Sequence, residues 1–329
     1  QVTNPAIDPL RESLVMSLST YLGNKGNILE NNKNIKKIKL NSPVLNENTL
    51  EEISNSNIQT SKISTCFKIN NNKYSLEKAL NELCTNAEKH INNGSEIIIL
   101  SDKQSSLSSE KPFIPPLLAV GTLHHFLIRN NLRQKISIIV ETGQCWSTHH
   151  FACLIGYGAS AICPYLALET TRQWWSNPRT KKLIETGKLK ELSIIDAQSN
   201  YKKAIELGLL KILSKMGISL LSSYQGAQIF EALGIGNQII DNAFSGTVSR
   251  IGGLTFKELE KEVFCSYANG FSIENKKKLV NYGFIQYRPG GEYHINNPEM
   301  SKLLHKAVRG YKQEHYDNYT KLISNRPIT

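Results

Sequence analysis

The sequence lacks any long apolar run and any closely spaced pair of cysteines. No stretch of its 329 residues approaches the roughly 20 apolar residues that a membrane-spanning helix needs, so no membrane partner is expected. Its six cysteines include no Cys-x-x-Cys pair, which argues against a zinc ribbon or a thioredoxin-type site. In a chain with a sizeable core, such cysteines are expected to be buried, reduced thiols.

An initiator methionine is also missing, and the opening residues, QVTNPAIDP, are polar and have no signal-peptide pattern. We therefore expect the chain to be either processed or a piece of something longer. Its length suffices for one large α/β domain or two ordinary ones. A hydrophobic content of 40% and an aromatic content of 8% fit a globular protein.

Positive charge is present in excess, with a formal net charge of +11 at pH 7. Basic proteins often bind nucleic acid or acidic partners. Here the basic residues are scattered in short runs such as Lys181–Lys182, without the interleaved aromatic residues of a nucleic-acid-binding surface. We expect no nucleic-acid partner and interpret most of the charge as solvated surface, while an acidic partner stays open.

The middle of the chain alternates short β-branched runs with helical patterns. The runs Glu96–Leu100, Ile136–Val140 and Ala159–Cys163 predict buried strands. Apolar residues at helical spacing after Pro115, and again over His149–Ile155, predict helices between them. This order implies parallel strands with right-handed crossovers. The predicted fold class is α/β, with parallel β-α units in an incomplete or altered (β/α) barrel.

Further elements are predicted from periodicity and from glycines that follow it. The helices are Leu10–Leu22, Thr49–Asn55, Leu76–Asn92, Asn200–Met216, Ala227–Leu233, Thr255–Asn269 and Met300–Tyr319. The remaining strands are Lys62–Ile69 and Ile218–Leu221.

Three groups of residues are candidates for chemistry. Asp102 and Glu141 follow or end successive predicted strands, where parallel β/α proteins often place catalytic carboxylates, although both residues could equally cap the following loops. The segment 246–253 combines glycines, hydroxyls and Arg250, as in an anion-binding loop, but it lacks a phosphate-loop spacing, and we favour a packed turn.

The third group consists of two histidine pairs, His124–His125 and His149–His150. Neighbouring side chains on a helix point about 100° apart, so a pair cannot converge on one metal ion. No Asp or Glu lies at ligand spacing, and metal binding is not expected.

Several longer motifs occur together and in order. They are VTNP near the start, ILSD (99–102), PPLLAVG (115–121), ETGQ (141–144), THHFACLIGYGA (148–159) and CPYLALET (163–170). In these motifs the chain resembles the glutamate synthases, the iron–sulfur flavoproteins that make glutamate from glutamine and 2-oxoglutarate. The resemblance extends over essentially the whole chain and is weakest over residues 31–73.

The resemblance implies a fragment of such an enzyme, and the plastid-like composition favours ferredoxin over NAD(P)H as its electron donor. Residues 1–290 would be an N-terminally truncated central domain, and residues 291–329 would begin the FMN-binding domain. FMN and a 3Fe-4S cluster would belong to the full-length enzyme, with none bound by this fragment, which also lacks the compact cysteine group of the cluster. Ferredoxin would be the partner of the whole enzyme.

The implied role of the segment is to link the glutaminase and FMN domains and to help form the ammonia channel. Thr3 and Asn4 would lie at that channel, although Asn4 before Pro5 also suits a simple turn. A composition rich in Asn, Ile and Lys favours a plastid, with the cytoplasm of a bacterium as the alternative. The competing interpretations are a self-standing barrel enzyme that uses Asp102, Glu141 and the loop 246–253 on a phosphorylated small molecule, and a basic nucleic-acid-binding module.

Overall fold

The computed structural model describes residues 12, 14–27, 29, 35–69, 75–271 and 281–326. The chain divides into two compact units, Gln1–Phe271 and Ser272–Thr329. The first contains all of the sheets found among the described residues, and the second consists of two helices with their connections.

A four-stranded parallel sheet forms the centre of the first unit. Its strands are β3 (Thr60–Ser64), β4 (Ile97–Ser101), β5 (Ser137–Glu141) and β6 (Ala161–Cys163), in the spatial order of the sequence. The helices α3 (Ser75–Asn92), α4 (Pro116–Arg129) and α5 (Thr148–Gly156) connect them. The α/β prediction with parallel β-α units is therefore confirmed. The sheet does not close into a barrel within the described part of the chain.

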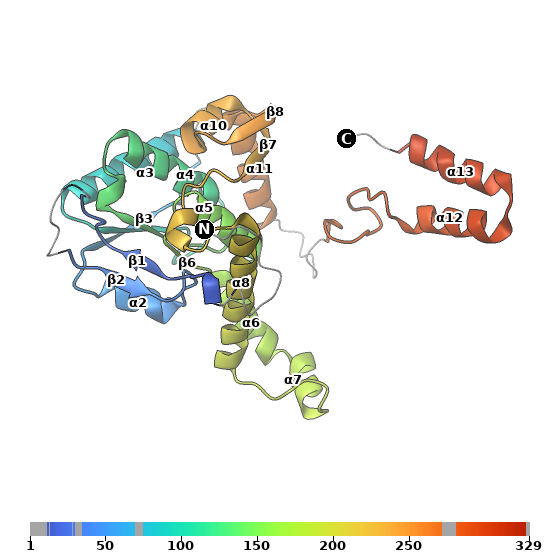
Figure 1. The fold of residues 1–329 in the computed structure, drawn as a ribbon, viewed down its shortest axis with the longest axis horizontal. Coiled ribbons are helices and arrows are strands. Elements are labelled where there is room, and N and C mark those ends of the chain that lie inside the picture. Colours follow the sequence, from blue (N-terminus) through green and yellow to red (C-terminus); the bar gives the residue numbers. More distant parts are fainter. Residues whose placement is uncertain are drawn as a thin grey trace. The chain divides into compact units, whose positions relative to one another are not determined.

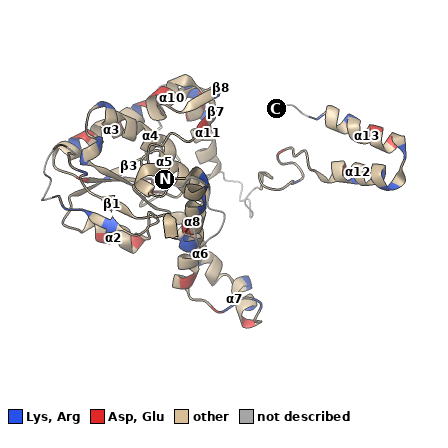
Figure 2. Ribbon diagram, viewed as in Figure 1, with Lys and Arg blue, Asp and Glu red and all other residues tan. Residues whose placement is uncertain are grey.

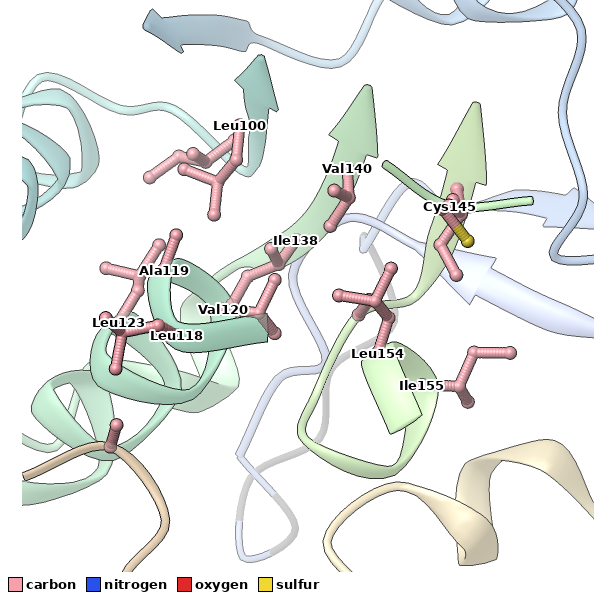
Figure 3. Close-up of a cluster of buried hydrophobic side chains, with 14 of the residues drawn as sticks. Leu100, Leu118, Ala119, Val120, Leu123, Ile138, Val140, Cys145, Leu154 and Ile155 are labelled. Carbon is pink, nitrogen blue, oxygen red and sulfur yellow. The ribbon is translucent and has the colours of Figure 1, made fainter. Parts of the chain in front are cut away.

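Both faces of this sheet are covered at the inner strands β4 and β5, which explains why these strands are mostly apolar, whereas the edge strand β3 is polar and partly exposed. On one face Ile98, Leu100, Ile138 and Val140 pack against α4 and α5, as Figure 3 shows for the side chains labelled there. On the other face the alternate residues, such as Ile99 and Ile139, join a second cluster. Every residue of β4 and β5 is buried as a result.

The second cluster is completed by α2 (Glu47–Ser54) and by the antiparallel pair β1 (Thr20–Leu22) and β2 (Ile38–Leu40). These elements lie on the opposite side of the sheet from α3 and α4 (Figure 1). The prediction of a helix over Leu10–Leu22 is wrong at its C-terminal end. Thr20 and Leu22 are buried while Tyr21 is 54% exposed, an alternation that suits a strand.

An arm of three helices extends from the sheet: α6 (Tyr165–Ser176), α7 (Pro178–Glu185) and α8 (Ile194–Met216) (Figure 1). The indole N–H of Trp175 donates to the carbonyl of Leu192 at 2.7 Å and ties α6 to the start of α8. Helix α8 begins before the predicted Asn200, because Ser193 and Asp196 form a capping box.

The rest of the first unit contains α9 (Leu221–Tyr224), β7 (Glu231–Ile235), α10 (Asn237–Ala243), β8 (Val248–Leu254) and α11 (Phe256–Asn269). The helix predicted over Ala227–Leu233 is wrong, because Glu231–Ile235 pairs with β8 in a parallel ladder. The strand predicted over Ile218–Leu221 is also wrong, and only a single bridge joins Ser17 and Leu220. The helix predicted over Thr255–Asn269 is confirmed, with Thr255 as its N-cap.

The second unit contains α12 (Pro298–Gly310) and α13 (Gln313–Ser324), packed against each other. The single helix predicted over Met300–Tyr319 is wrong, because the chain turns at Tyr311, whose φ of 48° is left-handed.

Charge and thiols follow simple patterns. Figure 2 shows Lys and Arg scattered over many elements and mixed with Asp and Glu. All six cysteines are free thiols, of which four are buried, Cys66 is partly exposed and Cys265 is exposed. No helix in the described ranges is long and apolar enough to cross a membrane.

Candidate functional site

The carboxyl edge of the parallel sheet brings Asp102 and Glu141 together, as the sequence predicts. Asp102 follows β4, and Glu141 is the last residue of β5, where it pairs in register with Ser101 on one side and Cys163 on the other. Both carboxylates are buried, with residue exposures of 6% and 4%. Such burial costs free energy unless the charged oxygens have partners, so their contacts decide what they can do.

Asp102 is held by the loop that follows β5. The hydroxyl of Thr142 donates to its carboxylate at 2.5 Å, and the backbone N–H of Gly143 donates at 3.0 Å. The hydroxyl of Tyr165, which follows β6, is a third partner. Burial raises the pKa of Asp102 above its usual value, while the hydrogen bonds from Thr142, Gly143 and Tyr165 oppose that rise.

Glu141 is held from the other direction, by β3 and β4. The Ser101 hydroxyl donates to its Oε2 at 2.5 Å, and the ammonium of Lys62 lies 2.5 Å from the same oxygen. The ammonium of Lys103 lies 4.0 Å from the second oxygen, Oε1, and 5.4 Å from the centre of the Tyr165 ring. The two carboxylates thus have partners within the domain, which is the pattern of strand-end capping and not of a catalytic pair exposed to substrate.

Residues 246–253 do not form an anion-binding loop. Most of them belong to β8, whose backbone groups pair with β7. Arg250 is exposed, and its nearest acidic partner is Glu231, with 3.7 Å between Nε and the carboxylate. Gly253 packs against the backbone of Gly234, which leaves no room for a β-carbon. The prediction of a packed turn is therefore wrong as well, since residues from Val248 onward form the strand β8.

The histidine pairs serve different contacts and do not converge on one centre. Nδ1 of His124 accepts a hydrogen bond from Nε of Arg133 at 2.9 Å, and its ring packs edge-on against His125. On α5, His150 packs edge-on against Trp146, while His149 lies 3.5 Å from the thiol of Cys153. No group of three or more His, Cys, Asp or Glu residues that could hold a metal ion occurs in the described parts of the chain.

Thr3 and Asn4 lie outside the described residues. Sequence reasoning also missed Lys62, Tyr165 and Arg133. The position of Tyr165, just after a buried strand, is the same signal that singled out Asp102 and could have found it. Lys62 and Arg133 carry no comparable signal, because their roles depend on the strand register and on the packing of α4.

Comparison with known proteins gives a consistent result. A family model described as "Glutamate synthase central domain" matches residues 1–236. The chain is 60% identical to a ferredoxin-dependent glutamate synthase of Pyropia yezoensis over 330 residues, which cover 100% of this chain and 22% of that protein. It is 54% identical to the chloroplastic ferredoxin-dependent enzyme of Spinacia oleracea, with 100% and 20% covered. The chain thus spans about a fifth of the length of these curated relatives.

A solved structure of a flavocytochrome b2 variant with bound sulfite aligns with 73% of this chain and 47% of its own. The sequence identity is 12% and the TM-score 0.34, a likeness too low to establish a shared fold.

Proposed function

The chain belongs to the glutamate synthase central domain family, and we propose that it is the central part of a ferredoxin-dependent glutamate synthase. The observation that carries this proposal is the identity of 52–60% to ferredoxin-dependent enzymes over the whole chain, from Pyropia yezoensis to Synechocystis. The whole enzyme would make L-glutamate from L-glutamine and 2-oxoglutarate with electrons from reduced ferredoxin. A plastid is the compartment in which we place it, since the spinach relative is named as chloroplastic.

Within that enzyme this segment would act as a scaffold. We assign residues 1–290 to the central domain and residues 291–329 to the start of the FMN-binding domain. The glutaminase, the FMN site and the 3Fe-4S cluster would lie in other parts of the polypeptide. Support for a scaffold comes from the carboxyl edge of the sheet, where Asp102 and Glu141 both form hydrogen bonds or ion pairs with other residues of this chain. The same contacts, together with the strand at 248–254, remove the support for a self-standing barrel enzyme.

The size of the native polypeptide tests the first part of the proposal. An immunoblot of source cells, with an antibody against this segment, should give a band several times heavier than 36.9 kDa. Purified 329-residue chain should retain no stoichiometric FMN and should not hydrolyse glutamine. A native band near 36.9 kDa, or stoichiometric FMN on the isolated chain, would overturn the assignment.

The proposed role of Thr3 and Asn4 at the ammonia channel needs the intact enzyme. A damaged channel lets ammonia escape. The Asn4→Ala enzyme should therefore hydrolyse more molecules of glutamine than it makes molecules of glutamate from 2-oxoglutarate. The matched control is Asn48→Ala, at an exposed position on α2. Equal stoichiometry of hydrolysis and synthesis in Asn4→Ala and in Thr3→Val would remove both residues from the channel.

A further inference from the structure

A second polar site lies at the opposite, amino edge of the parallel sheet. There the connections from α4 to β5 and from α5 to β6 meet the loop after β1 and the segment around α9. Together they line a pocket of about 600 Å³, within the usual size range of small-molecule sites. The carboxylates discussed above do not line this pocket.

The lining of this amino-edge pocket is one-sided in charge. It includes two cationic side chains, Lys25 and Arg133, and hydrogen-bond donors such as Ser222, Gln225 and Gln228. None of the described residues that line it is Asp or Glu. The nearby carboxylate of Glu96 is not part of the lining, and it accepts a hydrogen bond from the backbone N–H of Asn24 at 3.1 Å.

Arg133 is fixed in place at the back of the pocket. Its residue exposure is 8%, and it donates to Nδ1 of His124 at 2.9 Å and to the carbonyls of Ile136 and Gly158 at 2.8 Å each. A guanidinium has five N–H groups, so two are left without a partner within the part of the chain that the structure describes. Buried donors of this kind normally have acceptors.

His124 adds a further oriented donor. Because its Nδ1 accepts from Arg133, the neutral ring carries its hydrogen on Nε2. Burial, and then the nearby charge of Arg133, lowers the pKa of His124 to about 3, so the ring is neutral at physiological pH. Gly158 leaves room for this ring, because a β-carbon there would lie 2.9 Å from Cγ of His124, and its φ of +116° favours glycine.

Lys25 shows that the positive charge is not balanced. No ion pair to it is found among the described residues. Lys25 is exposed overall, yet partial desolvation lowers its pKa, and the charges of Arg133 and Lys37 lower it further. At the C-terminus of α5, the carbonyls of Leu154 and Gly156 already accept hydrogen bonds from the backbone N–H groups of Ala159 and Gly226.

We propose that the amino-edge pocket binds a small oxyanion, a carboxylate or phosphate group, held by the free N–H groups of Arg133, by Nε2 of His124 and by Lys25. A guanidinium fork matches the paired oxygens of either group. The proposal concerns a surface separate from the carboxyl edge and does not depend on the activity of the whole enzyme.

The accessibility of Lys25 to an amine-reactive reagent tests this site directly in the intact enzyme. Peptide mass spectrometry would measure the labelling rate of Lys25 with inorganic phosphate, with succinate, and with chloride at equal ionic strength. A bound anion raises the pKa of the lysine, and one pKa unit makes labelling about tenfold slower. The exposed Lys188 provides the reference within the same digest.

Saturable protection by phosphate alone would identify a phosphate site, and protection by succinate alone would identify a carboxylate site. Protection by both would leave the shared oxyanion chemistry as proposed. Binding measured by calorimetry should weaken about tenfold in Lys25→Gln and not in Lys188→Gln. Equal labelling in phosphate, succinate and chloride would overturn the proposal, as would a Lys25 that reacts only after denaturation.

Discussion

Gly121, in the middle of α4, is the position where the smallest change should have a large effect on stability. A β-carbon added there would fall inside the contact distance of the backbone carbonyl of Ala243 and would lie 2.9 Å from Cε1 of Phe244. Both belong to the end of α10, whose residues Ile239 and Ala243 are fully buried against the core. Because the obstacle includes backbone, α10 would have to move for Gly121→Ala to fit.

Two opposing effects set the size of the stability change expected for Gly121→Ala. Replacing glycine by alanine within a helix is worth about 1 kcal/mol in intrinsic propensity. Forcing an extra carbon into a packed core typically costs about 1–3 kcal/mol, and sometimes more where backbone must shift. A displacement of α10 on the order of 1 Å would also forfeit a quarter to a half of the dispersion energy at that contact. We therefore expect a net destabilisation of about 2 kcal/mol.

Thermal unfolding of the chain provides the assay. For a unit of this size, about 2 kcal/mol corresponds to a fall in Tm of roughly 3–4 °C. The matched control is Gly252→Ala in β8, where nothing lies within 4 Å of the added carbon and the expected change is within about 0.5 kcal/mol. If Gly121→Ala melted at or above the temperature of Gly252→Ala, the close packing of α4 on α10 would be refuted.

Two further changes test the carboxyl edge and the helical arm. Since the pKa of Asp102 is raised above its usual value of 3.8, the native state binds the proton more tightly than the unfolded state, and this contribution is lost as pH rises through the folded pKa. The Tm of Asp102→Asn relative to the unmodified chain should therefore increase from pH 4.5 to pH 7.5, and a flat or falling difference would contradict the raised pKa. Trp175→Phe removes the hydrogen bond to Leu192 and should destabilise the arm by about 1 kcal/mol, measured by faster hydrogen exchange in α6 and early α8. Trp174→Phe, next to it and 46% exposed, should leave exchange unchanged.

The central sheet could be predicted because its strands carry their own signal. Ile136–Val140 is apolar except at Ser137, and it lies in a sheet whose two faces are both covered at this strand. The segment 227–233 shows the limit of such reasoning. Its residues Glu231–Leu233 favour helix, yet they form β7 because the next strand, β8, pairs with them. The prediction of one continuous helix across Tyr311 failed for a different reason. A left-handed tyrosine is uncommon, and Gly310 is only a weak signal for a helix end.

The candidate site was predictable in position but not in chemistry. That Asp102 and Glu141 would meet follows from the common direction of parallel strands. That Lys62 would reach Glu141 depends on the register between β3 and β4, which pairs Lys62 with Ile99 and which the sequence does not specify. Predicting the amino-edge pocket would require still more structural information, because Arg133, His124 and Lys25 come together only through the packed connections of three separate elements.

The contacts at the carboxyl edge are best understood as one network that joins the ends of all four strands. Glu141, on β5, is bound by Lys62 from β3 and by Ser101 from β4. Asp102, just after β4, is bound by residues that follow β5 and β6. Leaving a buried acceptor without its hydrogen-bond donor typically costs about 1–3 kcal/mol, so each strand end is held by its neighbours. An edge that is held in this way resists rearrangement around a substrate, and such rigidity is what the proposed scaffold role would require.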